Sequence, residues 1–126
     1  MVKLIPVKQD IFTSDDEKIL GNCLQAAIAS MTDQPLGIVP HTVYHYDWYR
    51  RLQLWLKNTL DLTLRSTSWD DVKPDEYVLV VGVSPRNPTW YHAVVYQNGA
   101  LAHDPHPDNT GVVSVSSIYT LRPLGV

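Results

Sequence analysis

The chain has one cysteine, and its surroundings in the sequence favour chemistry. Cys23 follows the pair Gly21-Asn22, which is typical of a turn and a helix N-cap, and good helix formers extend from it to Met31. The thiol is therefore predicted in the first turn of a helix, where unpaired backbone N–H groups and the helix dipole stabilise a thiolate. A lone cysteine before an apolar helix is also commonly a small buried hydrophobic residue. A second signal has to decide between these interpretations.

A histidine and an aspartate in the C-terminal half supply that signal. His92 interrupts an apolar segment, and Asp104 lies on the segment that returns after the turn sequence Asn98-Gly99. If the turn has three loop residues, His92 lies directly opposite Asp104, and the carboxylate can hold the imidazole. If the turn has two, His92 pairs with Pro105, and Asp104 points to the other face. The turn sequence permits both registers.

Cysteine, histidine and aspartate supply three roles of nucleophilic catalysis. A thiolate attacks a carbonyl, an imidazole transfers the proton, and a carboxylate orients the imidazole. The tetrahedral oxyanion also needs hydrogen-bond donors, and the backbone N–H of Cys23 is one candidate. A side-chain amide is the second, for which Gln9 is preferred and Asn22 is the alternative, although glutamine is more commonly a surface residue.

These motifs resemble the papain-like cysteine peptidases, particularly the compact bacteriocin-processing and cell-wall-hydrolase types. The resemblance covers most of the chain and rests on Gln9, the Gly21-Asn22-Cys23 turn before an Ala-rich helix, the His92-Ala-Val-Val-Tyr96 strand and Asp104. The whole sequence is also similar to small uncharacterised phage-encoded proteins that end in a comparable His-Asp-Pro-His-Pro segment. No defined substrate comes with this resemblance.

The resemblance implies a fold and a role for each matching residue. A helix bearing the cysteine would pack on an antiparallel sheet bearing the histidine and its partner. The implied roles are nucleophile for Cys23, base and acid for His92, orienting residue for Asp104 and oxyanion donor for Gln9.

Two positions depart from the family pattern. The glutamine of papain-like enzymes usually lies about six residues before the cysteine, where this chain has Glu17. Gln9 would reach the site only if residues 10–20 formed a looped insertion. Leu24 stands where larger relatives often have an aromatic residue after the cysteine.

The hydrophobic pattern predicts helices first and strands afterwards. After the helix at 23–31, a second amphipathic helix is predicted over residues 43–58. Residues 77–83 form a continuous apolar run, which is typical of a central strand buried on both faces. The remaining expected strands are an alternating segment at Leu62 and Leu64, the hairpin 90–96 and 100–104, and residues 112–118. The expected fold is α+β and papain-like, with the nucleophile helix packed on four to five antiparallel strands.

Length and composition limit the alternatives. With 126 residues and 14.3 kDa, we expect a single domain over residues 1–126. Ten Lys and Arg against 13 Asp and Glu give a net charge of −3, which argues against nucleic acid or an anionic membrane as a partner. No apolar run approaches the length of a membrane span, and neither a signal peptide nor an internal disulfide is expected. We therefore expect a cytoplasmic protein, which for a phage product would mean the host cytoplasm.

A metal site is the main alternative within catalysis. Its candidate ligands are His92, His103, Asp104, His106 and Asp108, with a second pair at His41 and His45. Prolines at 105 and 107 argue against a regular element that would bring such ligands together. We expect no metal and no cofactor, and a polar loop for His103, His106 and Asp108.

A binding module without catalysis is the other alternative. Trp90 and Tyr91 are predicted to border a substrate cleft, because adjacent strand residues face opposite ways and one must leave the core side. The loop at 84–89 could form one wall. A catalytically silent papain-like domain could use this cleft to hold a peptide or a partner protein.

The function expected from the sequence is thiol-dependent hydrolysis. The amide bond would lie in a peptide, an isopeptide or a peptidoglycan stem, so the expected partner is a peptide or protein substrate. Deamidation and acyl transfer use the same three residues and stay open. No residue argues for or against a further partner chain.

Overall fold

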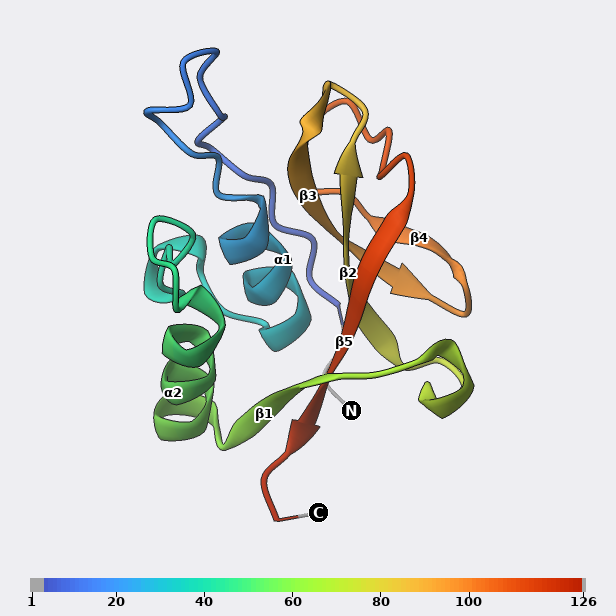
Figure 1. The fold of residues 1–126 in the computed structure, drawn as a ribbon. Helices are drawn as coiled ribbons and strands as arrows, with labels where there is room; N and C mark the ends of the chain where they lie inside the picture. The colour runs from blue at the N-terminus through green and yellow to red at the C-terminus, as the bar shows by residue number, and fades with distance from the viewer. Residues whose placement is uncertain (1–3, 126) are drawn as a thin grey trace.

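The computed structural model describes residues 4–125 as two α-helices packed on one face of a five-stranded antiparallel sheet (Figure 1). The helices are α1 (Cys23–Thr32) and α2 (Trp48–Leu60), with 3₁₀ turns η1 (Leu36–Ile38) and η2 (Trp69–Asp71). The strands are β1 (Leu62–Ser66), β2 (Tyr77–Ser84), β3 (Asn87–Gln97), β4 (Ala100–His103) and β5 (Val115–Pro123). This confirms the α+β class. Within the described residues, no helix has the length and apolar character needed to cross a bilayer.

Helix α1 forms where the sequence predicts it and ends one residue later. Its apolar stripe of Leu24, Ala27, Ile28 and Met31 is buried, because α1 packs against β3 and β2. Asp33 adopts a left-handed conformation after the last turn and donates its backbone N–H to a carbonyl of that turn. Because α1 packs on β3 and β2, its first residue, Cys23, lies against the sheet.

Helix α2 begins five residues later than predicted. The interval at 43–47 forms turns, in which the N–H of His45 bonds to the Thr42 carbonyl. A tertiary contact explains the later start of α2: the Tyr44 hydroxyl accepts a hydrogen bond of 2.8 Å from the N–H of Leu20. This contact ties the segment to the chain before α1 rather than to a helix. The predicted apolar face is correct, with Leu52 and Leu56 fully buried.

Strand β2 lies in the centre of the sheet, as its apolar run predicts. The strand order is β1-β5-β2-β3-β4, and Val78, Leu79 and Val80 are each at most 1 % exposed. Leu79 belongs to the core under the helices, whereas Val78 and Val80 belong to a smaller core on the opposite face. Burial on both faces explains why this strand lacks alternation.

Strand β5 is shifted along the chain from the expected 112–118. Regular pairing begins at Val115 because the register of β2 with β5 changes between Val81 and Gly82. The segment before β5 crosses so close to Gly82 that a Cβ there would lie 2.1 Å from the Ser114 carbonyl oxygen. Only glycine leaves room for this approach. β5 then extends to Pro123 and pairs with β1.

The hairpin of β3 and β4 combines a two-residue turn with a bulge. Gln97 pairs with Ala100 around Asn98-Gly99, so of the two registers that the turn sequence permits, the two-residue turn forms. A bulge then shifts the pairing by one residue: Tyr96 pairs with Leu101, but Val95 pairs with His103. This shift places Asp104 on the same face of the sheet as His92. Without it, the two-residue turn would have placed Asp104 on the opposite face. The bulge therefore creates the contact that the sequence left open.

Candidate active site

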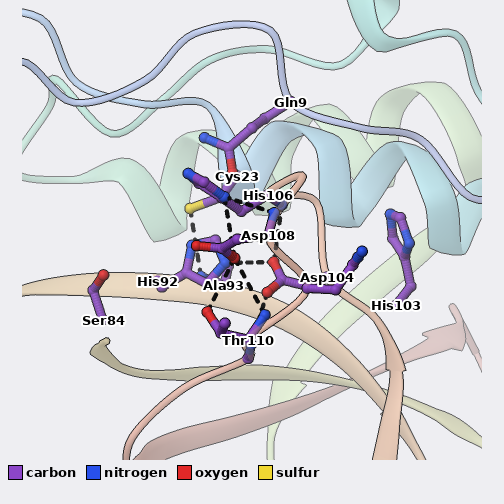
Figure 2. Close-up of polar contacts among 12 residues, drawn as sticks. Gln9, Cys23, Ser84, His92, Ala93, His103, Asp104, His106, Asp108 and Thr110 are labelled. Atoms are coloured by element: carbon purple, nitrogen blue, oxygen red, sulfur yellow. Dashed lines mark hydrogen bonds and ion pairs between the residues drawn. The ribbon is translucent and has the colours of Figure 1, made fainter. Parts of the chain in front are cut away.

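Cys23 lies at the first position of α1, with its sulfur against β3. The thiol is partly exposed, and its Sγ accepts a hydrogen bond of 3.4 Å from the backbone N–H of Ala93 (Figure 2). Ala93 directly follows His92 on the strand. Packing of α1 on β3 therefore sets the sulfur beside the imidazole.

Asn22 occupies the predicted N-cap position but uses its side chain elsewhere. Its Oδ1 accepts the N–H groups of Asp10 and Ile11 at 3.1 and 2.9 Å, and its Nδ2 donates to Asp10 and Gln25. Within residues 4–125 the side chain caps none of the first-turn N–H groups of α1. These groups stay available to an anion at Cys23. Because both amide protons of Asn22 are engaged, the geometry favours Gln9 as the side-chain oxyanion donor.

His92 and Asp104 form a buried pair. They are 3 % and 2 % exposed, and Nε2 of His92 lies 2.6 Å from Oδ1 of Asp104. The carboxylate also accepts the backbone N–H groups of His106 and Gly111 at 2.9 and 2.8 Å. Burial alone would raise the pKa of Asp104, but the hydrogen bonds from His92 and these two N–H groups lower it. Asp104 therefore stays ionised and orients the ring.

His92 is held as an imidazolium near neutral pH. Burial opposes the charge, but the hydrogen bond to Asp104 and the hydrogen bond and charge of Cys23 together raise the pKa of His92 to about 9. Asp104 occupies Nε2, so Nδ1 is the ring nitrogen left for the sulfur. The three side chains therefore stand in the order thiol, imidazole, carboxylate.

Two hollows meet at Cys23 and His92 and together form a cleft. The larger has a volume of about 540 Å³ and mostly apolar walls that include Trp48 and Tyr119. The smaller has a volume of about 80 Å³. The residues that line both are Thr13, Gly21, Cys23, Trp90, Tyr91 and His92. Trp90 and Tyr91 border the cleft, and Tyr91 is the one that turns to solvent, at 69 % exposed.

Gln9 lines the smaller hollow and is 7 % exposed. It reaches the site because residues 10–20 project as a loop, the blue excursion at one end of the molecule in Figure 1. Its backbone N–H bonds to the Pro105 carbonyl at 3.0 Å, and its Nε2 donates to the Ile11 carbonyl at 2.9 Å. Gly21 gives the amide room, because a Cβ there would lie 3.2 Å from Nε2. One Nε2 proton of Gln9 is left without a partner among residues 4–125.

The structure does not gather the histidine-rich segment into a metal centre. Among residues 4–125, no three His, Cys, Asp or Glu side chains are close enough to hold a metal ion. His103 instead bonds through Nε2 to the Val7 carbonyl at 2.7 Å, His41 bonds to the Leu20 carbonyl, and His45 is exposed.

The sequence did not predict that His106 would line the smaller hollow. It was expected in a plain polar loop, yet its ring lies 6.2 Å from that of His92, centroid to centroid. The Asp104 carboxylate binds the backbone N–H of His106, and this bond holds the residue beside the site.

Comparisons with known proteins do not assign the chain to a family. No protein-family model, no curated protein and no solved structure matches it. The function has to be inferred from the geometry of Cys23, His92 and Asp104 and from the cleft around them.

Proposed function

We propose that the protein is a thiol-dependent hydrolase that cleaves an amide bond through Cys23, His92 and Asp104. The observation that carries the proposal is the buried His92–Asp104 contact of 2.6 Å, which aims the free ring nitrogen at a thiol in the first turn of a helix. The order of a cysteine helix followed by a histidine-bearing antiparallel sheet also agrees with the papain-like peptidases that the sequence resembles.

The first half of the reaction is acylation of Cys23. The thiolate attacks the carbonyl carbon, and the carbonyl π electrons move to oxygen to give a tetrahedral oxyanion. Collapse of this intermediate breaks the C–N bond, and Nδ1–H of the His92 imidazolium protonates the departing nitrogen. A thioester and a free amine result. Asp104 holds the ring in place through both steps.

The oxyanion is stabilised from the side of the smaller hollow. The free Nε2 proton of Gln9 and the backbone N–H of Cys23 are the donors. The Gln9 amide is held by the bond from Nε2 to the Ile11 carbonyl, and its buried Oε1 has no hydrogen-bond partner among residues 4–125.

The second half is hydrolysis of the thioester. Neutral His92 removes a proton from water, and the resulting hydroxide attacks the acyl carbon. The C–S bond breaks, the carboxylic acid product leaves, and the Cys23 thiolate and the His92 imidazolium are restored. No oxidant, metal or cofactor takes part in this scheme.

A peptide, an isopeptide or a peptidoglycan stem suits the cleft. The larger hollow beside the thiol leaves space for a substrate group next to the scissile bond. The larger, with Leu24, Val43 and Trp48 in its walls, suits an apolar group.

The test is product formation by wild type and Cys23→Ala with two substrate pools, a peptide library and soluble muropeptides. Mass spectrometry should find new amine and carboxylate ends with wild type alone. The Cys23 side chain is partly exposed and accepts one hydrogen bond, of 3.4 Å, from a backbone N–H, so the variant should keep the fold. Equal cleavage by the variant would overturn the nucleophile assignment. A cleft that binds peptides with an unreactive Cys23 would instead establish the binding-module function.

A further inference from the structure

One histidine that lines the smaller hollow together with Cys23 and Gln9 has no role in the acylation and hydrolysis steps. His106 lies in the loop after β4, and its ring packs edge-on against Phe12 with centroids 5.2 Å apart. Figure 2 shows this ring close to Cys23, on the side where the Gln9 amide lies. The side chain is 19 % exposed. The ring is thus fixed by packing at the wall of the hollow.

The hydrogen bonds of His106 determine which ring nitrogen carries the proton. Nδ1 lies 3.1 Å from both the backbone nitrogen and Oδ1 of Asp108, but only the contact from the backbone N–H has hydrogen-bond geometry. Oδ1 of Asp108 accepts hydrogen bonds from the backbone N–H and the hydroxyl of Thr110 instead. A backbone N–H can only donate, so Nδ1 is the acceptor and the proton is on Nε2.

Nε2–H of His106 is a neutral donor without a partner among residues 4–125. Burial, and then the positive charge of Arg86, lower the pKa of His106 and outweigh the opposing charge of Asp108. Arg86 is held there by a 2.7 Å ion pair with Asp108. A neutral donor can stabilise a developing negative charge without placing a second cation beside the His92 imidazolium.

We propose that the smaller hollow is an oxyanion-binding site in which Nε2–H of His106 is a donor alongside the Gln9 amide. The inference rests on the proposed function, because the oxyanion arises when the Cys23 thiolate attacks a carbonyl. The hollow, with a volume of about 80 Å³, has room for a carbonyl oxygen and its immediate surroundings. By this assignment His106 is a catalytic residue that touches the reacting oxygen.

Two reactions of the same thiol separate this role from any effect on the nucleophile. Alkylation by iodoacetamide is a displacement at carbon that forms no oxyanion. Acetylation by p-nitrophenyl acetate passes through one: the C–S bond forms, the carbonyl electrons move to oxygen, and p-nitrophenolate leaves with the electrons of the broken C–O bond. The second-order rate constants of both reactions are measured at one pH for each variant.

Three variants complete the experiment. His106→Phe keeps an aromatic ring against Phe12 but removes the donor. His106→Gln restores one, because Nε2 lies the same number of bonds from Cβ in glutamine as in histidine. His45→Phe makes the same substitution at an exposed histidine outside both hollows and is the control.

The expected result is a split between the two rates. His106→Phe should slow acetylation by about 100-fold, the loss typical of one oxyanion donor, and leave alkylation within twofold of wild type. His106→Gln should recover most of the acetylation rate. Unchanged acetylation in His106→Phe, or an equal fall in both rates, would overturn the assignment of His106 while leaving the nucleophile intact. A wild-type thiol that alkylates readily but never acetylates would overturn the proposed function together with this inference.

Discussion

Removal of the His92 imidazole should change how the stability of the protein depends on pH. The pKa of His92 rises from 6.5 to about 9 on folding, through its hydrogen bond to Asp104 and its contact with Cys23, against the opposing effect of burial. A group whose pKa is raised on folding stabilises the folded state fully below its unfolded pKa. That contribution is lost as the pH rises through the folded value. The window for His92 is therefore pH 6.5 to about 9.

The size of the effect follows from the shift. Each pKa unit corresponds to about 1.4 kcal/mol, so the change from 6.5 to about 9 corresponds to about 3 kcal/mol of unfolding free energy. His92 is 3 % exposed, so solvent screening reduces this figure little.

The assay is urea unfolding across pH 6 to 10 of Cys23→Ala and of Cys23→Ala/His92→Gln, so that the thiol does not titrate in the same window. The difference in unfolding free energy between these two variants should fall through the window, by up to about 3 kcal/mol. His45→Gln in the Cys23→Ala background, which removes an exposed histidine, should track Cys23→Ala throughout. A difference that stays flat, or that is lost around pH 6.5, would refute the coupling of His92 to Asp104.

Three further substitutions test the parts around this pair. Asp104→Asn should lower turnover less than His92→Ala and destabilise the fold by about 1–3 kcal/mol, because it sets an amide against buried backbone N–H donors; an equal loss of turnover would make Asp104 chiefly a hairpin residue. Gln9→Leu should slow acetylation of Cys23 by about 100-fold and leave its alkylation unchanged. If the variant is acetylated as fast as wild type, Gln9 is not an oxyanion donor. Gly82→Ala should cost about 1–3 kcal/mol in urea unfolding because its Cβ would meet a carbonyl 2.1 Å away. Gly37→Ala, where the added Cβ has no neighbour within 4 Å, is the control and should be near neutral.

Local patterns in the sequence predict the elements that carry the nucleophile and the base. Helix α1 follows from an apolar stripe, and β2 follows from its continuous apolar run. Both depend on residues close together in the chain. The start of α2 does not, because the Tyr44 hydroxyl binds the N–H of Leu20 from 24 residues away.

The site itself is predicted only in part because long-range hydrogen bonds complete it. The sequence offers His92 and Asp104 but not the bulge that joins them, since the Asp104 carboxylate is also anchored by the N–H of Gly111 beyond a loop. His106 escapes prediction because its role depends on the tautomer set by Asp108. No periodicity encodes either feature.

The most direct test of the account is the rate of Cys23 alkylation by iodoacetamide at pH 6 and pH 8. The comparison is between wild type and His92→Ala, each native and in urea. An unperturbed thiol should react about 75-fold faster at pH 8, because its ionised fraction rises by that factor. If Cys23 and His92 form an ion pair, native wild type should show a small pH effect and His92→Ala nearly the full rise. Native wild type that shows the full rise, with no change on removal of His92, would contradict it.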